Sequence, residues 1–306
     1  MSTPTRPTDA LGLAVAQFAP TEDEAANRAE IERLARLAVG RGAALVVFPE
    51  YANWFTRDLG PQWRDHAEGE DGAFVRFLSS LSDDLDAHLV AGMIGEPSNG
   101  GSNKVGNVVV AVAPSQGVVA RYRKLHLYDA FGGRESDWIE PGRISEGGPE
   151  VFEVGGFTVG LQTCYDLRFP EVTRWLVEAG VEIVAMPAEW VRGPLKEAHW
   201  RTLITARAIE NTVWMAASDH SPNVGVGQSM VVDPMGVEVV TVGEEPSGLA
   251  VAWLTRERLD SVRRTNPSLT LRRFRVAPGN AGEPTLRGPT LGEPTLGEPT
   301  LGELTN

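Results

Sequence analysis

The chain has 306 residues, of which 42% are hydrophobic and 23% are charged, a composition that excludes a collagen-like or wholly disordered protein. It carries 28 lysine and arginine residues against 41 aspartate and glutamate residues, for a net charge of −13. This balance disfavours nucleic acid as a partner, because binding to phosphates requires clustered cations. The only cysteine is Cys164, which excludes an intramolecular disulfide and a zinc site built on cysteines.

The amino-terminal region contains no long apolar run of the kind found in secretory signals. No window of the sequence reaches the roughly 18 apolar residues that a membrane-spanning helix needs. We therefore expect a cytoplasmic protein without membrane contact. Residues 1–10 are polar and include two prolines, so we expect them to form a flexible leader.

Apolar periodicity predicts the secondary structure along the rest of the chain. In the first half, helices are expected at 22–39 and 72–88, and strands at 11–18, 43–48, 88–94, 105–113 and 117–122. In the second half, helices are expected at 170–179 and 199–211, and strands at 151–154, 157–162, 183–186, 213–217, 230–233, 237–242 and 248–254. Helices that alternate with strands, with hairpins in between, predict a layered α/β protein with mixed sheets.

The carboxy-terminal end of the chain is a degenerate repeat of the pentapeptide Gly-Glu-Pro-Thr-Leu. Recurrent proline and glycine with few bulky apolar groups cannot bury enough surface to offset the entropy of ordering. We expect residues 281–306 to be a disordered tail after a single domain at 11–280. A solenoid is the weaker alternative, because so few short repeats would scarcely form a core.

Cys164 follows the predicted strand at 157–162 and precedes the predicted helix at 170–179. The thiol is therefore expected at a strand-to-helix turn, on the edge of the sheet where α/β proteins bind ligands. The alternative is that a lone cysteine is a small buried hydrophobe. The polar neighbours Asp166 and Arg168 weaken that alternative, because polar residues are uncommon around a core side chain.

Two charged residues follow other predicted strands. Glu50 comes after an apolar strand and a proline, where partial desolvation would raise the pKa of its carboxyl group and suit it to general base catalysis. Lys124 follows the strand at 117–122, and its ammonium group suits the stabilisation of an oxyanion. Taken singly, each is more readily explained as a solvated surface residue. With Cys164 they supply the residue types of an activated nucleophile, although sequence spacing does not establish that the three meet.

Several motifs, in this order, resemble those of the nitrilase superfamily of carbon–nitrogen hydrolases. They span about residues 11–254 and comprise FPE at 48–50, YRKLHLYD at 122–129, CYDLRFPE at 164–171, ARAIEN at 206–211 and SMVVDPMG at 229–236. The resemblance implies an α/β four-layer αββα sandwich with two mixed sheets. It also implies an enzyme that uses neither a cofactor nor a metal.

By this resemblance Glu50 is the general base, Lys124 stabilises the oxyanion and Cys164 is the nucleophile. The implied reaction is attack of the thiolate on an amide carbonyl, loss of ammonia, and hydrolysis of the resulting thioester by water. The backbone N–H of Tyr165 is expected to help Lys124 to bind the oxyanion.

The family often carries a second glutamate after the lysine motif, where it helps to position the substrate and orient the lysine or the thiol. Glu135 matches that glutamate, and Glu140 is the competing candidate. The segment between Asp129 and Glu135 is shorter than in some relatives.

The CYDLRFPE motif is most similar to the Nit branch, which includes omega-amidases and deaminated glutathione amidases. These enzymes cleave the terminal amide of small α-keto or dicarboxylic substrates. Arg168 is a candidate anchor for a substrate carboxylate, because a guanidinium group binds carboxylates through two parallel hydrogen bonds. A structural ion pair with Asp166 or Glu171 is an equally weighted alternative.

Glu189 and Trp190 lie in the segment expected to form the substrate loop. Glu189, Trp190 and Arg192 depart from the small residues expected in the deaminated glutathione enzymes, which leaves the substrate open. Trp190 fits either the wall of a substrate pocket or the core.

The expected partner is a small-molecule amide, and the resemblance implies a homodimer or a higher homo-oligomer. The helices at 170–179 and 199–211 are candidates for the interface, with Trp175, Leu176 and Val177 as apolar contacts, unless these side chains pack on their own sheet. The alternatives to an amidase are an N-carbamoyl amino acid hydrolase of the same superfamily and a catalytically inactive binding member. The intact Glu50, Lys124 and Cys164 argue against the inactive member.

Overall fold

The computed structural model describes residues 9–98, 102–144 and 148–276. The expected tail at 281–306 and most of the expected leader at 1–10 lie outside these residues. The last residue assigned to the leader, Ala10, is the first residue of a strand. None of the helices within the described residues meets the length and hydropathy that a bilayer-spanning segment requires.

The first sheet is mixed and has the strand order β13-β1-β2-β3-β4-β5, with β6 paired to β4. Its strands are β1 (Ala10–Gln17), β2 (Leu45–Val47), β3 (His88–Gly95), β4 (Val105–Ala113), β5 (Gly117–Arg123), β6 (Ile139–Glu140) and β13 (Gly248–Thr255). Strands β1, β2 and β3 are parallel to one another. Strand β13 is antiparallel to β1, β4 is antiparallel to β3 and β5, and β6 is parallel to β4.

The second sheet is also mixed and has the order β12-β11-β10-β9-β8-β7. Its strands are β7 (Val151–Val154), β8 (Phe157–Leu161), β9 (Ile183–Ala188), β10 (Trp214–Asp219), β11 (Met230–Val232) and β12 (Glu238–Thr241). The central strands β8, β9 and β10 are parallel.

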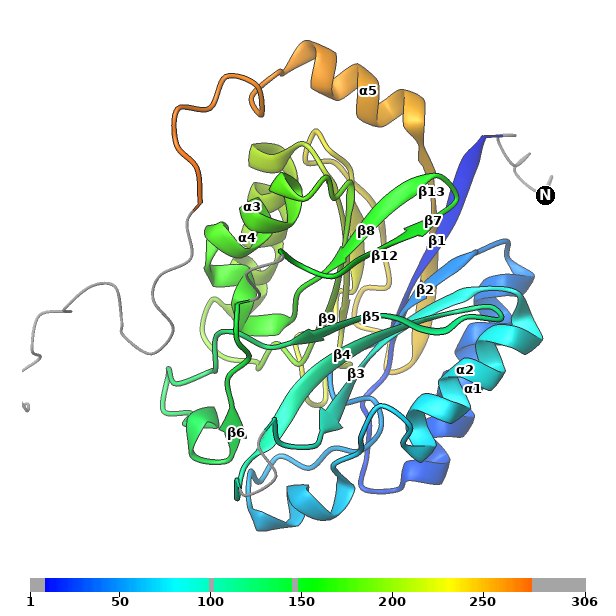
Figure 1. Ribbon diagram of the computed structural model, residues 1–306, viewed down its shortest axis with the longest axis vertical. Coiled ribbons are helices and arrows are strands. Elements are labelled where there is room, and N and C mark those ends of the chain that lie inside the picture. Colours follow the sequence, from blue (N-terminus) through cyan, green and yellow to red (C-terminus); the bar gives the residue numbers. More distant parts are fainter. Residues whose placement is uncertain (1–8, 99–101, 145–147, 277–306) are drawn as a thin grey trace, which may run out of the picture. The chain divides into compact units, whose positions relative to one another are not determined.

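The main helices are α1 (Glu24–Gly40), α2 (Ala73–Leu85), α3 (Pro170–Glu178), α4 (Lys196–Asn211) and α5 (Arg256–Thr265). Short 3₁₀ turns are η1 (Pro61–His66), η2 (Glu135–Asp137) and η3 (Cys164–Arg168). Helices α1 and α2 cover the first sheet, and α3 and α4 lie against the second (Figure 1). This arrangement confirms the expected four-layer αββα sandwich.

The short strand β2 shows why apolar runs are continuous in this fold. Leu45 and Val47 face the core between the two sheets, and Val46 faces the core under α1 and α2. Because successive side chains of a strand point to opposite faces, a strand buried on both faces needs apolar residues at every position. The same reasoning accounts for the fully buried β1, β4, β9 and β10.

Strand β9 departs from the prediction that it would end at residue 186, since it continues through Pro187 to Ala188. The carbonyl group of Pro187 accepts a hydrogen bond from Thr163, beyond the last pair between β8 and β9. In a strand, the N–H and C=O groups of one residue point towards the same neighbouring strand. The position of the missing N–H of Pro187 therefore faces the β8 side of β9, where β8 has already ended. Proline is tolerated at such unpaired positions.

Helix α4 begins at Lys196, three residues before its predicted start. The candidate interface residues Leu176 and Val177 are buried against the second sheet of their own chain. The alternative that these two pack on their own sheet is therefore the correct one. Trp175 is half-buried.

Candidate active site

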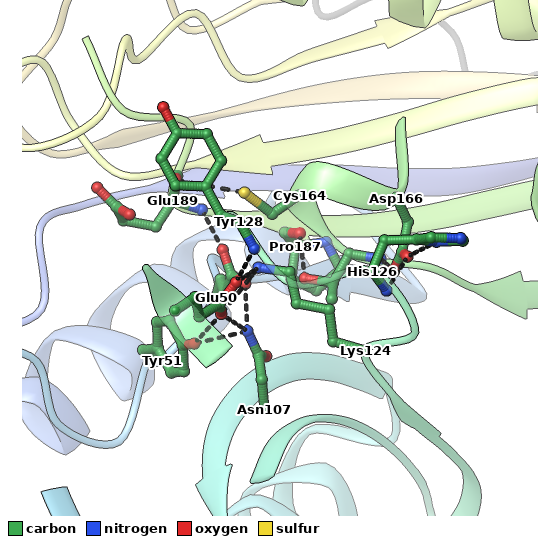
Figure 2. Close-up of polar contacts among 12 residues, drawn as sticks. Glu50, Tyr51, Asn107, Lys124, His126, Tyr128, Cys164, Asp166, Pro187 and Glu189 are labelled. Carbon is green, nitrogen blue, oxygen red and sulfur yellow. Dashed lines mark hydrogen bonds and ion pairs between the residues drawn. The ribbon is translucent and has the colours of Figure 1, made fainter. Parts of the chain in front are cut away.

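Three strand ends bring the predicted catalytic residues to one place. Glu50 follows β2, Lys124 follows β5, and Cys164 follows β8. The Nζ atom of Lys124 lies 3.0 Å from Glu50 Oε1 and 3.0 Å from Glu135, and all three side chains are buried (Figure 2). The Cys164 Sγ lies 3.3 Å from the carbonyl oxygen of Glu189. The lysine is therefore clamped between two carboxylates beside a buried thiol.

The two carboxylates are held by donors that the sequence analysis missed. Asn107 Nδ2 donates to Glu50 Oε1 at 2.5 Å and to Glu135 Oε1 at 3.2 Å. The hydroxyl of Tyr51 donates to Glu135 Oε1 at 2.8 Å. The one sequence signal for Asn107 is a polar amide inside the otherwise apolar strand β4, because a buried polar side chain requires a partner.

Backbone contacts fix the orientation of Glu50. Its second oxygen, Oε2, accepts a hydrogen bond from the backbone N–H of Glu189 at 2.6 Å, and its carbonyl oxygen accepts one from His220 Nε2 at 2.6 Å. A Cβ atom added to Gly92 on β3 would lie 2.5 Å from the Cα of Glu50. Only glycine allows this close approach of β3 to the turn that carries Glu50.

Cys164 has a left-handed backbone conformation, with φ of 44°. This conformation is strained for a residue other than glycine, and such strain is typical of a nucleophile held on a strand-to-helix turn. The turn is braced by Thr163, whose hydroxyl donates to Pro187 O at 2.7 Å. Asp166 completes the brace by accepting hydrogen bonds from the Tyr122 hydroxyl at 2.7 Å and the His126 backbone at 3.0 Å.

The charges of the site follow from its burial. Burial raises the pKa of the Cys164 thiol well above its usual range, and the Glu50 carboxylate adds to this effect while Lys124 opposes it. The thiol is therefore protonated at rest, as its donation to Glu189 O requires. Burial also opposes a charge on Lys124, but Glu135 and Glu50 outweigh it and hold the pKa of the ammonium group well above the usual value.

A cavity of about 490 Å³ opens onto the site. Its lining includes all eight predicted site residues, namely Glu50, Lys124, Glu135, Cys164, Tyr165, Arg168, Glu189 and Trp190. The competing candidate Glu140 is not among the lining residues and instead contacts Arg123, 3.4 Å away. Burial raises the pKa of Glu189 well above its usual range, and Glu50 adds to the shift. Among the described residues, no three histidine, cysteine, aspartate or glutamate side chains are grouped to hold a metal ion.

Arg168 does not form the ion pair that was the alternative to substrate binding. Within the described ranges, neither Asp166 nor Glu171 pairs with it, and its Nε is buried without a hydrogen-bond partner. Its guanidinium carbon lies 4.7 Å from the centre of the Trp190 ring. Trp190 is itself buried and donates from Nε1 to Lys196 O at 2.9 Å, so it belongs both to the core and to the cavity wall.

Comparisons with known proteins agree with this geometry. Residues 12–264 match the family model described as carbon-nitrogen hydrolase. The chain is 39% identical over 267 residues to a deaminated glutathione amidase from Escherichia coli O157:H7, covering 86% of this chain and 97% of that relative.

Two solved structures share the fold. Nit3 of Saccharomyces cerevisiae, a member of branch 10 of the nitrilase superfamily, aligns with a TM-score of 0.76 at 25% identity, covering 90% of this chain and 99% of Nit3. A Nesterenkonia amidase variant, with the acetamide moiety of fluoroacetamide on its active-site cysteine, aligns with a TM-score of 0.70 at 25% identity, covering 87% and 98%. The chain therefore belongs to the carbon–nitrogen hydrolase family and is an amidase of the nitrilase superfamily.

Proposed function

We propose that the enzyme hydrolyses the amide of a small carboxylate-bearing substrate through a thioester on Cys164, with release of ammonia. The observation that carries this proposal is the clamping of Lys124 between Glu50 and Glu135 at the wall of the cavity that also holds the Cys164 thiol. In this arrangement one carboxylate serves as the base while the lysine stays charged to meet the oxyanion.

In the first half of the reaction Glu50 takes the proton of the Cys164 thiol, and the sulfur attacks the amide carbon. Lys124 and the backbone N–H of Tyr165 bind the oxyanion of the tetrahedral intermediate. Tyr165 is the second residue of η3, and the first N–H groups of a helix have no partner within it. Glu50 then returns the proton to the leaving nitrogen, the C–N bond breaks, and ammonia departs.

In the second half a water molecule replaces ammonia. Glu50 removes a proton from the water as its oxygen attacks the thioester carbon, and the same two donors bind the second oxyanion. Collapse of this intermediate breaks the C–S bond, the sulfur recovers its proton from Glu50, and the carboxylic acid leaves. Glu135 is a positioning residue for Lys124 throughout.

Two observations support a carboxylate-bearing substrate. The cavity lining is rich in cations, which are Arg57, Lys124, Arg134, Arg168, Arg192 and Lys196. The relative from Escherichia coli O157:H7 is named a deaminated glutathione amidase. We therefore assign Arg168 to the substrate carboxylate, and we assign Glu189 and Trp190 to substrate binding because they line the same cavity.

The test is ammonia release from a panel of glutaramate, succinamate, neutral aliphatic amides, N-carbamoyl amino acids and nitriles. We expect turnover of the carboxylate-bearing amides and its loss in Cys164→Ala. The conservatively changed Glu171→Gln, on the exposed start of α3, serves as a control that keeps activity. Amide turnover that survives in Cys164→Ala contradicts the mechanism, and turnover of carbamoyl amino acids alone contradicts the substrate class.

We further propose a cytoplasmic enzyme that forms a homodimer or a higher homo-oligomer, with one catalytic domain at 11–280. The single, unpaired Cys164 fits a reducing compartment, and the resemblance to the superfamily supports self-association. Light scattering coupled to size-exclusion chromatography tests the assembly, and a monomer at micromolar concentration contradicts it.

A further inference from the structure

The cations that line the cavity differ in whether the protein neutralises them. Lys124 pairs with two glutamates, while Arg134 and Arg192 lie 3.5 Å from Asp137 and 3.6 Å from Glu197, respectively. Arg57 is bonded to a backbone carbonyl group. Arg168 and Lys196 likewise form no ion pair with a described carboxylate, and they differ from Arg57 in that both lie over the rings of Phe131 and Trp190.

Arg168 and Lys196 are held over a shared set of aromatic rings. The Nζ atom of Lys196 lies 3.7 Å from the centre of the Phe131 ring and 4.8 Å from that of Tyr128. The guanidinium carbon of Arg168 lies 5.4 Å from the Phe131 centre and 4.7 Å from that of Trp190. Ring faces attract and orient cations, but they carry no net charge. The two positive charges therefore lie beside each other without a described carboxylate at ion-pair distance, and the Glu189 carboxylate of the same cavity opposes the effect of Arg168 on Lys196 only in part.

The position of Lys196 is unfavourable in three ways. It is buried, it lies beside Arg168, and it is the first residue of α4, where the helix dipole disfavours a cation. Burial, followed by the charge of Arg168, lowers the pKa of the ammonium group. The one polar partner of its Nζ among the described residues is the Tyr128 hydroxyl, at 2.8 Å. A local arrangement that disfavours the charge on several counts is typical of a functional site.

We propose that Lys196 and Arg168 together form the subsite that binds the substrate carboxylate, with Lys196 as a further specificity-determining residue. A carboxylate bound between these two lining residues would neutralise both charges. This inference rests on the proposed amidase function and names the part of the cavity that selects anionic amides over neutral ones.

Paired substrates that differ only in charge test the subsite during turnover. Glutaramate carries the carboxylate, and valeramide has a methyl group in its place. Removal of a charged hydrogen bond in Lys196→Gln should raise KM for glutaramate about tenfold or more, leaving kcat and the KM for valeramide little changed. Lys196→Arg keeps the charge and should retain most of the affinity.

Arg201→Gln is the matched control, since Arg201 lies on the same helix but pairs with Glu238 outside the cavity lining. It should leave both KM values unchanged. An equal rise in KM for glutaramate and valeramide in Lys196→Gln, or no rise for either, would overturn the subsite.

Isothermal titration calorimetry of glutarate with the Cys164→Ala protein measures binding to the subsite in the absence of turnover. We expect glutarate to bind, and the additional change Lys196→Gln to weaken binding about tenfold or more, while Arg201→Gln has no effect. Absence of glutarate binding, or equal binding with and without Lys196, overturns the subsite even if amides are hydrolysed. Conversely, Lys196-dependent binding by a protein that hydrolyses no amide would refute the proposed function and leave the subsite standing.

Discussion

Asn107 Nδ2 lies 2.5 Å from Glu50 Oε1, and both groups are buried. The same amide group lies 3.2 Å from Glu135 Oε1. One neutral side chain thus bridges the two carboxylate oxygens that face Lys124. This relationship makes Asn107 part of the machinery that positions the general base.

Replacement of Asn107 by leucine keeps the approximate size and removes the donor. We expect kcat to fall about tenfold to a hundredfold, because a hydrogen bond to a charged group contributes about 1.5–3 kcal/mol. KM should change much less, since Asn107 is not among the residues that line the cavity. Steady-state kinetics on protein shown to be folded by circular dichroism check this, and an unchanged kcat would contradict the assigned role.

Gly92 offers a test of backbone placement. In Gly92→Ala the new methyl group would meet the Glu50 Cα at 2.5 Å and the Tyr51 N at 2.9 Å, so the turn that carries Glu50 must shift. We expect a loss of kcat and of about 1–3 kcal/mol in the free energy of unfolding. Gly40→Ala is the control, because its added Cβ meets nothing within 4 Å. Equal behaviour of the two variants would refute this explanation.

The thiol should ionise at unusually high pH. Since burial raises the pKa of Cys164 and Glu50 raises it further, alkylation by iodoacetamide should increase with pH only above the range of a free cysteine. In Glu50→Gln the opposing negative charge is lost, so the alkylation profile should move to lower pH while turnover falls. The single cysteine makes the rate specific to this site. A profile that does not move in Glu50→Gln would show that the carboxylate has no influence on the thiol.

His220 should make the fold sensitive to acid. Burial lowers the pKa of this imidazole from 6.5 to about 4, so the unfolded chain binds a proton between these values and the folded chain does not. The contribution of His220 to the free energy of unfolding is therefore fully present above about pH 6.5 and is lost as the pH falls towards 4. The total loss from this group is about 3 kcal/mol. Urea unfolding at a series of pH values should show that the free energy of unfolding falls less steeply towards acid pH in His220→Gln than in the unchanged protein. The same dependence on pH in both proteins would contradict the prediction.

The sequence predicted most of the fold because the strands of a buried sandwich are continuous apolar runs, as in β2 and β4. The predicted end of β9 was wrong because the sequence does not show how far its neighbour β8 extends. The last pair between β8 and β9 involves Ala185, so the missing N–H of Pro187 costs no hydrogen bond to β8. Helix α5 was not predicted, since its inward side chains Leu259 and Val262 are few among arginines and acids.

The candidate site was predictable where residues follow strands or match family motifs, as with Glu50, Lys124 and Cys164. Tyr51 and Asn107 were missed because their role depends on distances between strands, which the sequence does not carry. Lys196 was missed for a related reason. Its neighbours Phe131 and Arg168 are distant in sequence, so neither the aromatic contacts nor the proximity of the two positive charges is visible before the chain is folded.

Mass spectrometry of enzyme quenched with acid during turnover of glutaramate detects the proposed thioester on Cys164 itself. We expect an acyl group on the peptide that contains Cys164, with the mass of glutaramate less ammonia, and its absence from Cys164→Ala. Steady ammonia release by Cys164→Ala, or an acyl group on a different residue, would contradict the thioester mechanism.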